Sequence, residues 1–257
     1  MDSAGDAGTA DWLVPDWPLP AGVHALCSTR AGGVSCGAYE GLNLGARVGD
    51  DPAHVEANRR RFGERLGVRA VFLDQLHGTR VLPLQASAAD GEAADASTTT
   101  ARGIACTVLV ADCLPVLFAD RAGRRVAAAH AGWRGLAAGV LERTVESFAE
   151  EGGAAQLSAW LGPCIGPDAF EVGEEVRVAF VQASPEAARC FVPGAAPGKW
   201  MADLAGLARQ RLSAAGVAAI HGNDGSEPWC TVHNPLRFFS HRRDRVSGRF
   251  GAAVWLD

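Results

Sequence analysis

Three short stretches of the chain each place a side chain that can bind a metal where an apolar run meets a glycine or a proline. They are DQLHGTRV around His77, LVADCLPVLF around Cys113 and AAAHAGWRG around His130. Chain reversals at such points bring the ends of separate strands together. Two imidazoles and one thiolate suit Zn²⁺, and three protein ligands leave the fourth position of a catalytic zinc open. The residue types therefore suit a zinc site, with Cu²⁺ as the alternative ion because its affinity for such ligands is generally higher.

Each of these residues also has an ordinary structural interpretation. A cysteine in an apolar strand is more often a small hydrophobic residue than a ligand, and the spacing matches none of the compact zinc motifs. Cys113 with His130 or His77 would also form the nucleophile and base of a cysteine hydrolase. The residues alone leave a metal centre, a nucleophilic cysteine and plain core packing open.

The elements that must position these residues mix strands and helices without strict alternation. Apolar runs predict strands at 23–30, 105–120 and 124–132, two strands around a polar centre at 70–84, and a strand that runs into a turn at 157–166. Helical periodicity predicts helices at 51–67, 136–153 and 202–216, and favours a helix at 169–183. The tail at 238–256 predicts a loop and a final strand. This order indicates an α+β fold, with helices layered on a largely antiparallel or mixed sheet.

Length and composition indicate one globular domain. We expect a disordered tail at 1–11, which is small and acidic, and a single catalytic domain at 12–257. The N-terminus lacks the pattern of a signal peptide, and no apolar run approaches the roughly 18 residues of a membrane span. A net charge of −5 without a basic cluster argues against nucleic acid as a partner. We therefore expect a cytoplasmic monomer, whose seven cysteines are thiols or ligands.

Four motifs in fixed order, QLHG, ADCLPVLF, HAGWRG and LGPCIG, make the chain similar to the YfiH-type family. The resemblance begins at WLVPDWPLP, reaches the final FFSHRRDRVSGRFGAAVWL and covers nearly the whole chain. Members have been named laccase-like polyphenol oxidase, purine nucleoside phosphorylase/adenosine deaminase and peptidoglycan editing factor. The resemblance implies an α/β sandwich fold shared distantly with cytotoxic necrotizing factor toxins. It also implies that His77, Cys113 and His130 bind zinc.

The activity implied by the resemblance is phosphorolysis of adenosine- and inosine-type nucleosides and deamination of adenosine. Cys113 and His130 are then catalytic as well as metal-binding, and Asp112 beside Cys113 is the candidate proton carrier. Adjacent residues on a strand point to opposite faces, so a capping or pairing role for Asp112 stays open. The candidate contacts to phosphate, ribose or purine are Arg30, Asn43, Gln75, Arg134 and Arg242.

Other functions stay open at this point. A cytoplasmic hydrolase that edits peptidoglycan precursors would use Cys113 as its nucleophile. A laccase-like polyphenol oxidase would need a blue-copper site and a separate trinuclear cluster, hence more histidines than the seven of this chain supply. A binding module would need neither an open coordination site nor clustered arginines. The family often has tyrosine where His241 stands, which leaves the role of His241 open.

Overall fold

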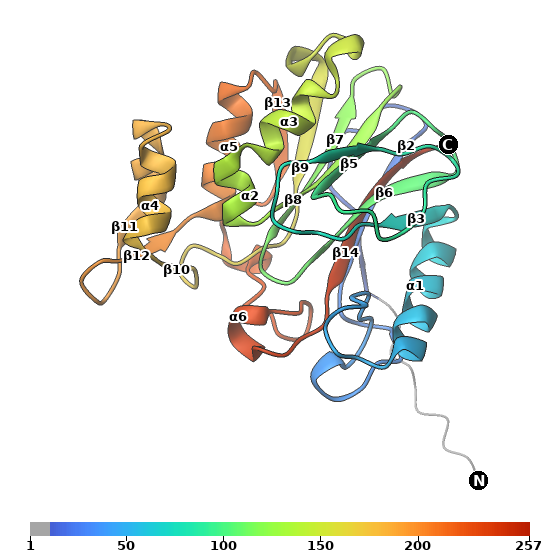
Figure 1. The fold of residues 1–257 in the computed structure, drawn as a ribbon, viewed down its shortest axis with the longest axis horizontal. Coiled ribbons are helices and arrows are strands. Elements are labelled where there is room, and N and C mark those ends of the chain that lie inside the picture. Colours follow the sequence, from blue (N-terminus) through green and yellow to red (C-terminus); the bar gives the residue numbers. More distant parts are fainter. Residues whose placement is uncertain (1–10) are drawn as a thin grey trace.

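The computed structural model describes residues 11–257, in which two large sheets pack face to face (Figure 1). The five-stranded sheet has the order β1-β2-β14-β6-β3, with the strands Trp12–Leu13, Val23–Ser28, Phe250–Leu256, Ile104–Val110 and Arg69–Phe72. The six-stranded sheet has the order β13-β9-β7-β8-β5-β4, with the strands Ala219–Gly222, Leu157–Leu161, Leu114–Asp120, Val126–Ala131, Ala96–Thr99 and Val81–Pro83. Each sheet contains parallel and antiparallel pairs. The predicted α+β fold with mixed sheets is confirmed.

Helices cover the outer faces of both sheets and complete a layered arrangement (Figure 1). Helix α1 (Pro52–Leu66) packs on the five-stranded sheet through Phe62 and Leu66. Its bounds follow from local chemistry, because the side chain of Asp51 accepts a hydrogen bond from the Ala53 amide and Gly67 ends the helix at φ +72°. The six-stranded sheet is covered by α2 (Trp133–Ala138), α3 (Val140–Glu146) and α5 (Leu204–Ala214).

Beyond these helices lies a small unit that the sequence patterns did not resolve. It consists of α4 (Glu174–Val181) and a three-stranded sheet in the order β10-β12-β11 (Glu171–Gly173, Lys199–Ala202 and Phe191–Pro193). The helix favoured at 169–183 is therefore shorter than expected and follows a strand. A last short helix, α6 (His241–Asp244), precedes β14. Short 3-10 helices lie at Gly37–Tyr39, Ala149–Glu151, Ala154–Gln156, Pro185–Cys190 and Glu227–Trp229.

Alternation along the strands divides the core into layers. On β8, Ala127, Ala129 and Ala131 face the helices, while Val126 and Ala128 face the other sheet. This two-residue period places His130 on the inner side, between the sheets. The alanines are fully buried, and their small size lets the helices and the second sheet approach β8 closely.

The structure corrects further sequence predictions. The helix predicted at 136–153 starts earlier, at Trp133, and is broken by Gly139 at φ +102°. The strand Ala96–Thr99 was missed because its polar threonines do not read as an apolar run. Of the tail predicted at 1–11, residues 1–10 lie outside the described part of the chain, and the carbonyl oxygen of Asp11 accepts a 2.7 Å hydrogen bond from Thr29. The single domain at 12–257 stays a prediction.

The segment predicted as one apolar stretch at 105–120 crosses from one sheet to the other. Strand β6 belongs to the five-stranded sheet and β7 to the six-stranded sheet, so Ala111, Asp112 and Cys113 form the crossing. The chain also crosses between the sheets from β3 to β4, and His77 lies on that crossing. Among residues 11–257, no helix combines the length and the apolar character that spanning a bilayer requires.

Candidate metal centre

His77, Cys113 and His130 meet at one edge of the two sheets. One donor atom from each lies within 4.8 Å of the others, and Sγ of Cys113 is 3.7 Å from Nε2 of His77. The pairing of β7 with β8 explains part of this arrangement, because Leu114 lies opposite Ala131 and thereby places Cys113 beside the end of β8. His130 is buried, whereas Cys113 is half-buried and His77 is exposed. The cluster is therefore open to solvent on the His77 side.

Asp95, immediately before β5, connects two of the three candidate ligands. Its Oδ1 lies 2.9 Å from Nδ1 of His130 and accepts a 2.8 Å hydrogen bond from the His77 amide. Its Oδ2 accepts hydrogen bonds from the amides of Leu76 and Gly78, at 3.1 and 2.6 Å. With Nδ1 of His130 bonded to the carboxylate, Nε2 is left for a metal. The three hydrogen bonds from backbone amides also stabilise the turn in which His77 has a φ of +62°.

Glycine at position 132 makes room for the cluster. A Cβ atom there would lie 2.7 Å from Cδ2 of His77 and 2.9 Å from Sγ of Cys113. Any larger residue would therefore displace two of the three side chains. The small residues around His130 thus serve two purposes, since the alanines admit neighbouring elements and Gly132 admits the other two ligands.

The three side chains of the cluster are electrostatically coupled. Burial favours the neutral thiol of Cys113, but the charge and hydrogen bonds of His130 and His77 prevail and lower its pKa to about 6. Burial also favours the neutral imidazole of His130, but Cys113 and Asp95 prevail and raise its pKa to about 9. For Asp95, hydrogen bonds from His130 and Gly78 outweigh the cost of burial and hold its pKa below the usual value. The arrangement therefore favours a thiolate beside a positively charged imidazole.

The donor set suits a metal ion. A tetrahedral zinc with bonds of about 2.0–2.3 Å holds its ligand atoms roughly 3.5 Å apart, close to the separation between Cys113 and His77. Asp95 supplies the outer hydrogen bond that a histidine ligand usually makes. His77, Cys113 and His130 are the three residues that would hold the ion.

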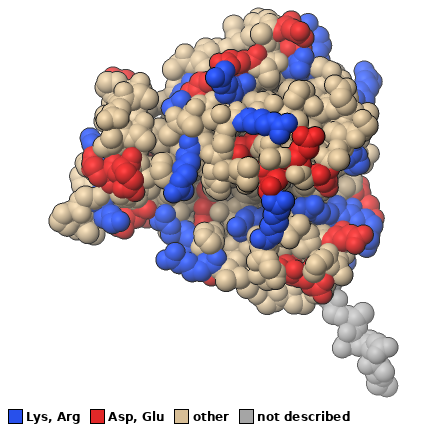
Figure 2. Space-filling model, viewed as in Figure 1, with Lys and Arg blue, Asp and Glu red and all other residues tan. Residues whose placement is uncertain are grey.

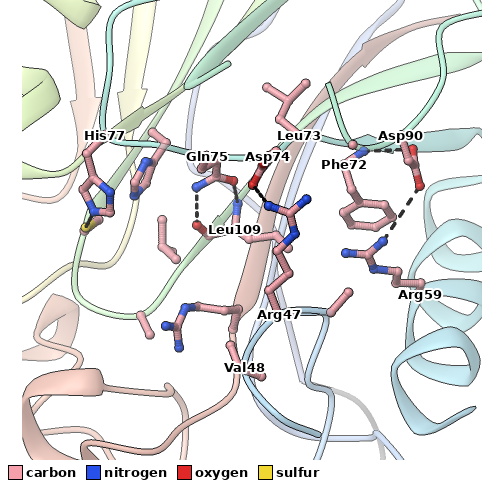
Figure 3. Close-up of a pocket in the computed structure, with 18 of the residues that line it drawn as sticks. Arg47, Val48, Arg59, Phe72, Leu73, Asp74, Gln75, His77, Asp90 and Leu109 are labelled. Carbon is pink, nitrogen blue, oxygen red and sulfur yellow. Dashed lines mark hydrogen bonds and ion pairs between the residues drawn. The ribbon is translucent and has the colours of Figure 1, made fainter. Parts of the chain in front are cut away.

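The cluster lies at the edge of a cavity of about 520 Å³, which is within the usual range for small-molecule sites. The cavity extends over Gln75 and Phe72 towards α1, and basic and acidic side chains alternate around the hollowed face of the molecule (Figures 2 and 3). Its charged and titratable lining, apart from the cluster, consists of Arg47, Arg59, Asp74, Asp90, His241 and Arg249.

Two predicted substrate contacts carry amide side chains, and the structure places them differently. Gln75 lines the cavity, and its amide exchanges two 2.8 Å hydrogen bonds with the backbone of Leu109 (Figure 3). Asn43 is fully buried outside the cavity, where its Oδ1 accepts hydrogen bonds from the amides of Gly45 and Arg249. Asn43 therefore acts in loop structure, as the turn chemistry of asparagine allows.

The three predicted arginine contacts lie outside the cavity lining. Arg30 donates to the carbonyl of Pro235 and lies 4.7 Å from the centre of the Phe239 ring. Arg134 is exposed and stacks on Trp133, with its guanidinium carbon 4.5 Å from the ring centre. The side chain of Arg242 donates to the carbonyls of Ala169 and Glu171. All three guanidinium groups contact backbone carbonyls or aromatic rings, and none of them lines the cavity.

Asp112 is committed to neighbouring residues. Its Oδ1 accepts a 2.6 Å hydrogen bond from the hydroxyl of Thr231, and its Oδ2 accepts one of 2.6 Å from the backbone amide of Arg242. The carboxylate thus fastens the crossing between the sheets to the start of α6. His241, the first residue of α6, lines the cavity.

The sequence interpretation missed Asp95 and the arginines that do line the cavity. Asp95 lies between small residues, and only the pairing of β5 with β8 brings it to His130. Arg47 follows the glycine-rich loop and Arg249 immediately precedes the final strand, so neither belongs to a recognisable binding motif. Nothing in the sequence marked these residues apart from other surface charges.

Comparison with known proteins shows the family of this chain. A family model described as multi-copper polyphenol oxidoreductase laccase matches residues 24–257. Purine nucleoside phosphorylase YfiH of Escherichia coli is 50% identical over 246 residues, which cover 95% of this chain and 98% of that protein. The chain belongs to the YfiH family. The resemblance stated from the motifs is therefore confirmed.

Two further relatives extend this YfiH-family match. A purine nucleoside phosphorylase of Pseudomonas aeruginosa is 56% identical over 245 residues, covering 95% of this chain and 98% of that protein. A crystal structure of a Neisseria meningitidis protein superposes with a TM-score of 0.89 at 47% identity, covering 96% of this chain and 99% of that one. Such coverage makes the YfiH fold that of the whole described chain.

Proposed function

We propose that this YfiH-family chain is a zinc-dependent purine nucleoside phosphorylase that also deaminates adenosine. The observation that carries the proposal is the convergence of His77, Cys113 and His130 at the edge of a cavity large enough for a nucleoside. The names of the bacterial relatives point to the same substrate class. A zinc ion held there would supply a Lewis acid able to polarise substrate atoms and to make water more acidic.

The two reactions break different bonds. In phosphorolysis, a phosphate oxygen bonds to C1′ of the ribose as the glycosidic bond breaks, and the purine leaves with the bonding electrons and takes up a proton. In deamination, water adds at C6 of adenosine and ammonia leaves, which gives inosine. Both require the protein to orient a purine nucleoside and to limit access of bulk water, which a partly enclosed cavity does.

The test combines metal analysis with product analysis. Purified protein should contain about one zinc ion per chain, and should release hypoxanthine from inosine only when phosphate is present. It should also form inosine from adenosine. His130→Ala should lose the metal and both activities, whereas His233→Ala, at an exposed position outside the cavity, should retain them. Zinc without turnover of any purine nucleoside would contradict the proposed substrate class.

A cysteine hydrolase is the second candidate, because Cys113, His130 and Asp95 occur in the order of nucleophile, base and orienting carboxylate. Hydrolysis of a cytoplasmic peptidoglycan precursor would fit this class. A metal-free purified protein with a rapidly alkylated Cys113 would favour it over the zinc enzyme. The metal content therefore decides between the two candidates.

Copper-dependent oxidation of phenols rests on the description of the family model. Within residues 11–257, His77, Cys113 and His130 form the single cluster of three candidate ligands. A multicopper oxidase needs further copper sites, so we propose no such activity here. Copper bound at the same three residues would still allow slow oxidation as a side reaction.

A further inference from the structure

Three guanidinium groups line the cavity, and two of them are neutralised by acidic neighbours. Arg47 forms an ion pair with Asp74, and Arg59 lies 3.8 Å from the carboxylate of Asp90 (Figure 3). Arg59 also donates to the carbonyl of Leu44 at 2.9 Å. Both charges are therefore balanced before any ligand enters.

Arg249 differs from the other two arginines. Its Nη1 donates to the carbonyls of Ser247 and Gly248, both at 2.9 Å, and these acceptors carry no net charge. Across residues 11–257, no carboxylate lies within ion-pair distance of Arg249, and its Nε and Nη2 atoms make no hydrogen bond. The side chain is half-buried, so this charge is partly removed from water without a counter-charge.

The position of Arg249 is fixed by the loop across from it. The backbone amide of Arg249 donates a 2.8 Å hydrogen bond to Oδ1 of Asn43, and its carbonyl accepts one of 2.9 Å from the amide of Leu44. A Cβ atom on Gly45 would lie 2.8 Å from Cγ of Arg249, so only glycine leaves room for this side chain. The guanidinium is thus held in place before a ligand binds.

The charge of Arg249 adds to that of the metal centre. Arg249 lines the same cavity as His77, Cys113 and His130. Burial lowers the pKa of Arg249, and the neighbouring charges of Cys113 and Asp112 partly oppose this. A zinc ion with one thiolate ligand carries a net positive charge. This end of the cavity therefore favours a small anion with several negative oxygen atoms.

We propose that Arg249 is the residue that binds the phosphate co-substrate, beside the His77–Cys113–His130 cluster. This inference rests on the proposed phosphorylase function. The unoccupied Nε and Nη2 donors form the edge of a guanidinium that contacts two oxygens of one phosphate. A phosphate held there would lie in the same cavity as a bound nucleoside, as phosphorolysis requires.

Binding of inorganic phosphate tests the site independently of turnover. Calorimetric titration of the zinc-loaded protein with phosphate should show that Arg249→Met weakens binding about 10- to 100-fold, as expected for loss of charged hydrogen bonds. Arg249→Lys keeps the charge but loses the bidentate contact, so its phosphate affinity should lie between those of the wild type and Arg249→Met. The matched control is Arg65→Met, at an exposed position in the last turn of α1, which should bind phosphate as the wild type does.

Kinetics then separate the phosphate site from the nucleoside site. Arg249→Met should raise KM for phosphate by a similar factor while KM for inosine changes less than threefold, and deamination of adenosine should continue. Unchanged phosphate affinity in Arg249→Met and Arg249→Lys would overturn the inference even if the wild type is a phosphorylase. Phosphate binding that depends on Arg249 in a protein without phosphorolysis would support the anion site and reject the proposed function instead. Zinc content and thermal unfolding of each variant verify that it is folded.

Discussion

Oδ1 of Asp95 lies 2.9 Å from Nδ1 of His130, and the same carboxylate accepts hydrogen bonds from the backbone amides on both sides of His77. One buried side chain therefore sets the orientation of one candidate ligand and the backbone turn that presents another. The exposed fraction of this carboxylate is 2%. Its charge is stabilised by four hydrogen bonds rather than by water, so its removal affects the metal centre directly.

Asp95→Asn should weaken zinc binding about 10- to 100-fold, as loss of an outer-shell hydrogen bond to a histidine ligand typically does. In the wild type, two carboxylate oxygens accept the four hydrogen bonds. Asparagine has only one oxygen, and its side-chain NH₂ group would face an N–H donor. Competition with a fluorescent zinc chelator measures the change. Asp16→Asn, at an exposed position outside the cavity, serves as the control and should bind zinc as the wild type does. Equal zinc affinity in the two variants would contradict the role assigned to Asp95.

Gly132→Ala should lose most of the bound metal while the fold is retained. The new Cβ would lie within 3 Å of both His77 and Cys113, so at least one of them must move away from the metal position. Elemental analysis measures the metal, and circular dichroism reports the fold. The control is Gly63→Ala in α1, where the Cβ atom would meet only the carbonyl of Val68 at 3.9 Å. Alanine at position 63 should stabilise the helix slightly and leave the metal content unchanged.

The meeting of three strand ends could be predicted from the sequence, whereas the residues that support it could not. His77, Cys113 and His130 each stand where an apolar run ends, and the fold brings those three ends together. Asp95 depends on the pairing of a threonine-rich strand with β8, which hydrophobic periodicity does not reveal. The sequence therefore supports an inference about ligand type better than one about outer-shell partners.

The predicted arginine contacts show that motif membership does not identify which arginines line the cavity. Motif membership drew attention to Arg30, Arg134 and Arg242, but these guanidiniums contact carbonyls or aromatic rings. Arg249 lines the cavity because Asn43 holds its backbone amide just before β14 and Gly45 leaves space. Such a position depends on two segments about 200 residues apart in the sequence, as the separation in the Asn43–Arg249 hydrogen bond shows. The local sequence pattern around Arg249 does not show that a segment so far away in the sequence contacts it.

Alkylation of the metal-free protein should depend on pH in a way that marks Cys113. Its pKa is lowered from the ordinary value of a thiol to about 6, so the reactive thiolate forms as the pH rises through about 6. The buried thiols of Cys106 and Cys190 have pKa values raised to about 12 and about 11, so they stay protonated and unreactive over this range. Peptide mass spectrometry after brief iodoacetamide treatment gives the rate at each site.

Zinc provides the control for that titration, and the exposed thiol of Cys36 provides the internal reference. Adding zinc should protect Cys113 and leave the labelling of Cys36 unchanged. Labelling of Cys113 that rises only near the ordinary thiol pKa of about 8.5 would show that the neighbouring imidazoles do not stabilise its thiolate. Protection of both residues by zinc would point to nonspecific binding of the metal to thiols.

Asp112→Asn should reduce stability and activity together, with zinc retained. The carboxylate accepts hydrogen bonds from Thr231 and from the Arg242 amide, and loss of its charge should cost about 1.5–3 kcal/mol of unfolding free energy. Asp112 has a φ of +90°, which asparagine tolerates about as well as aspartate, so the variant changes the hydrogen bonds and not the backbone preference. Thermal unfolding and steady-state kinetics measure both effects.

Comparison with Thr231→Val distinguishes a positioning role of Asp112 from that of a proton carrier. Removing the Thr231 hydroxyl keeps the carboxylate but removes one of its hydrogen bonds. If Asp112 has a positioning role, both variants should lose stability and turnover in proportion. A proton carrier predicts that only Asp112→Asn abolishes turnover, and that the pH profile of kcat loses one limb in that variant alone. Thr100→Val, at an exposed position outside the main cavity, should change neither quantity. We expect the proportional loss, because both carboxylate oxygens already accept hydrogen bonds from the protein.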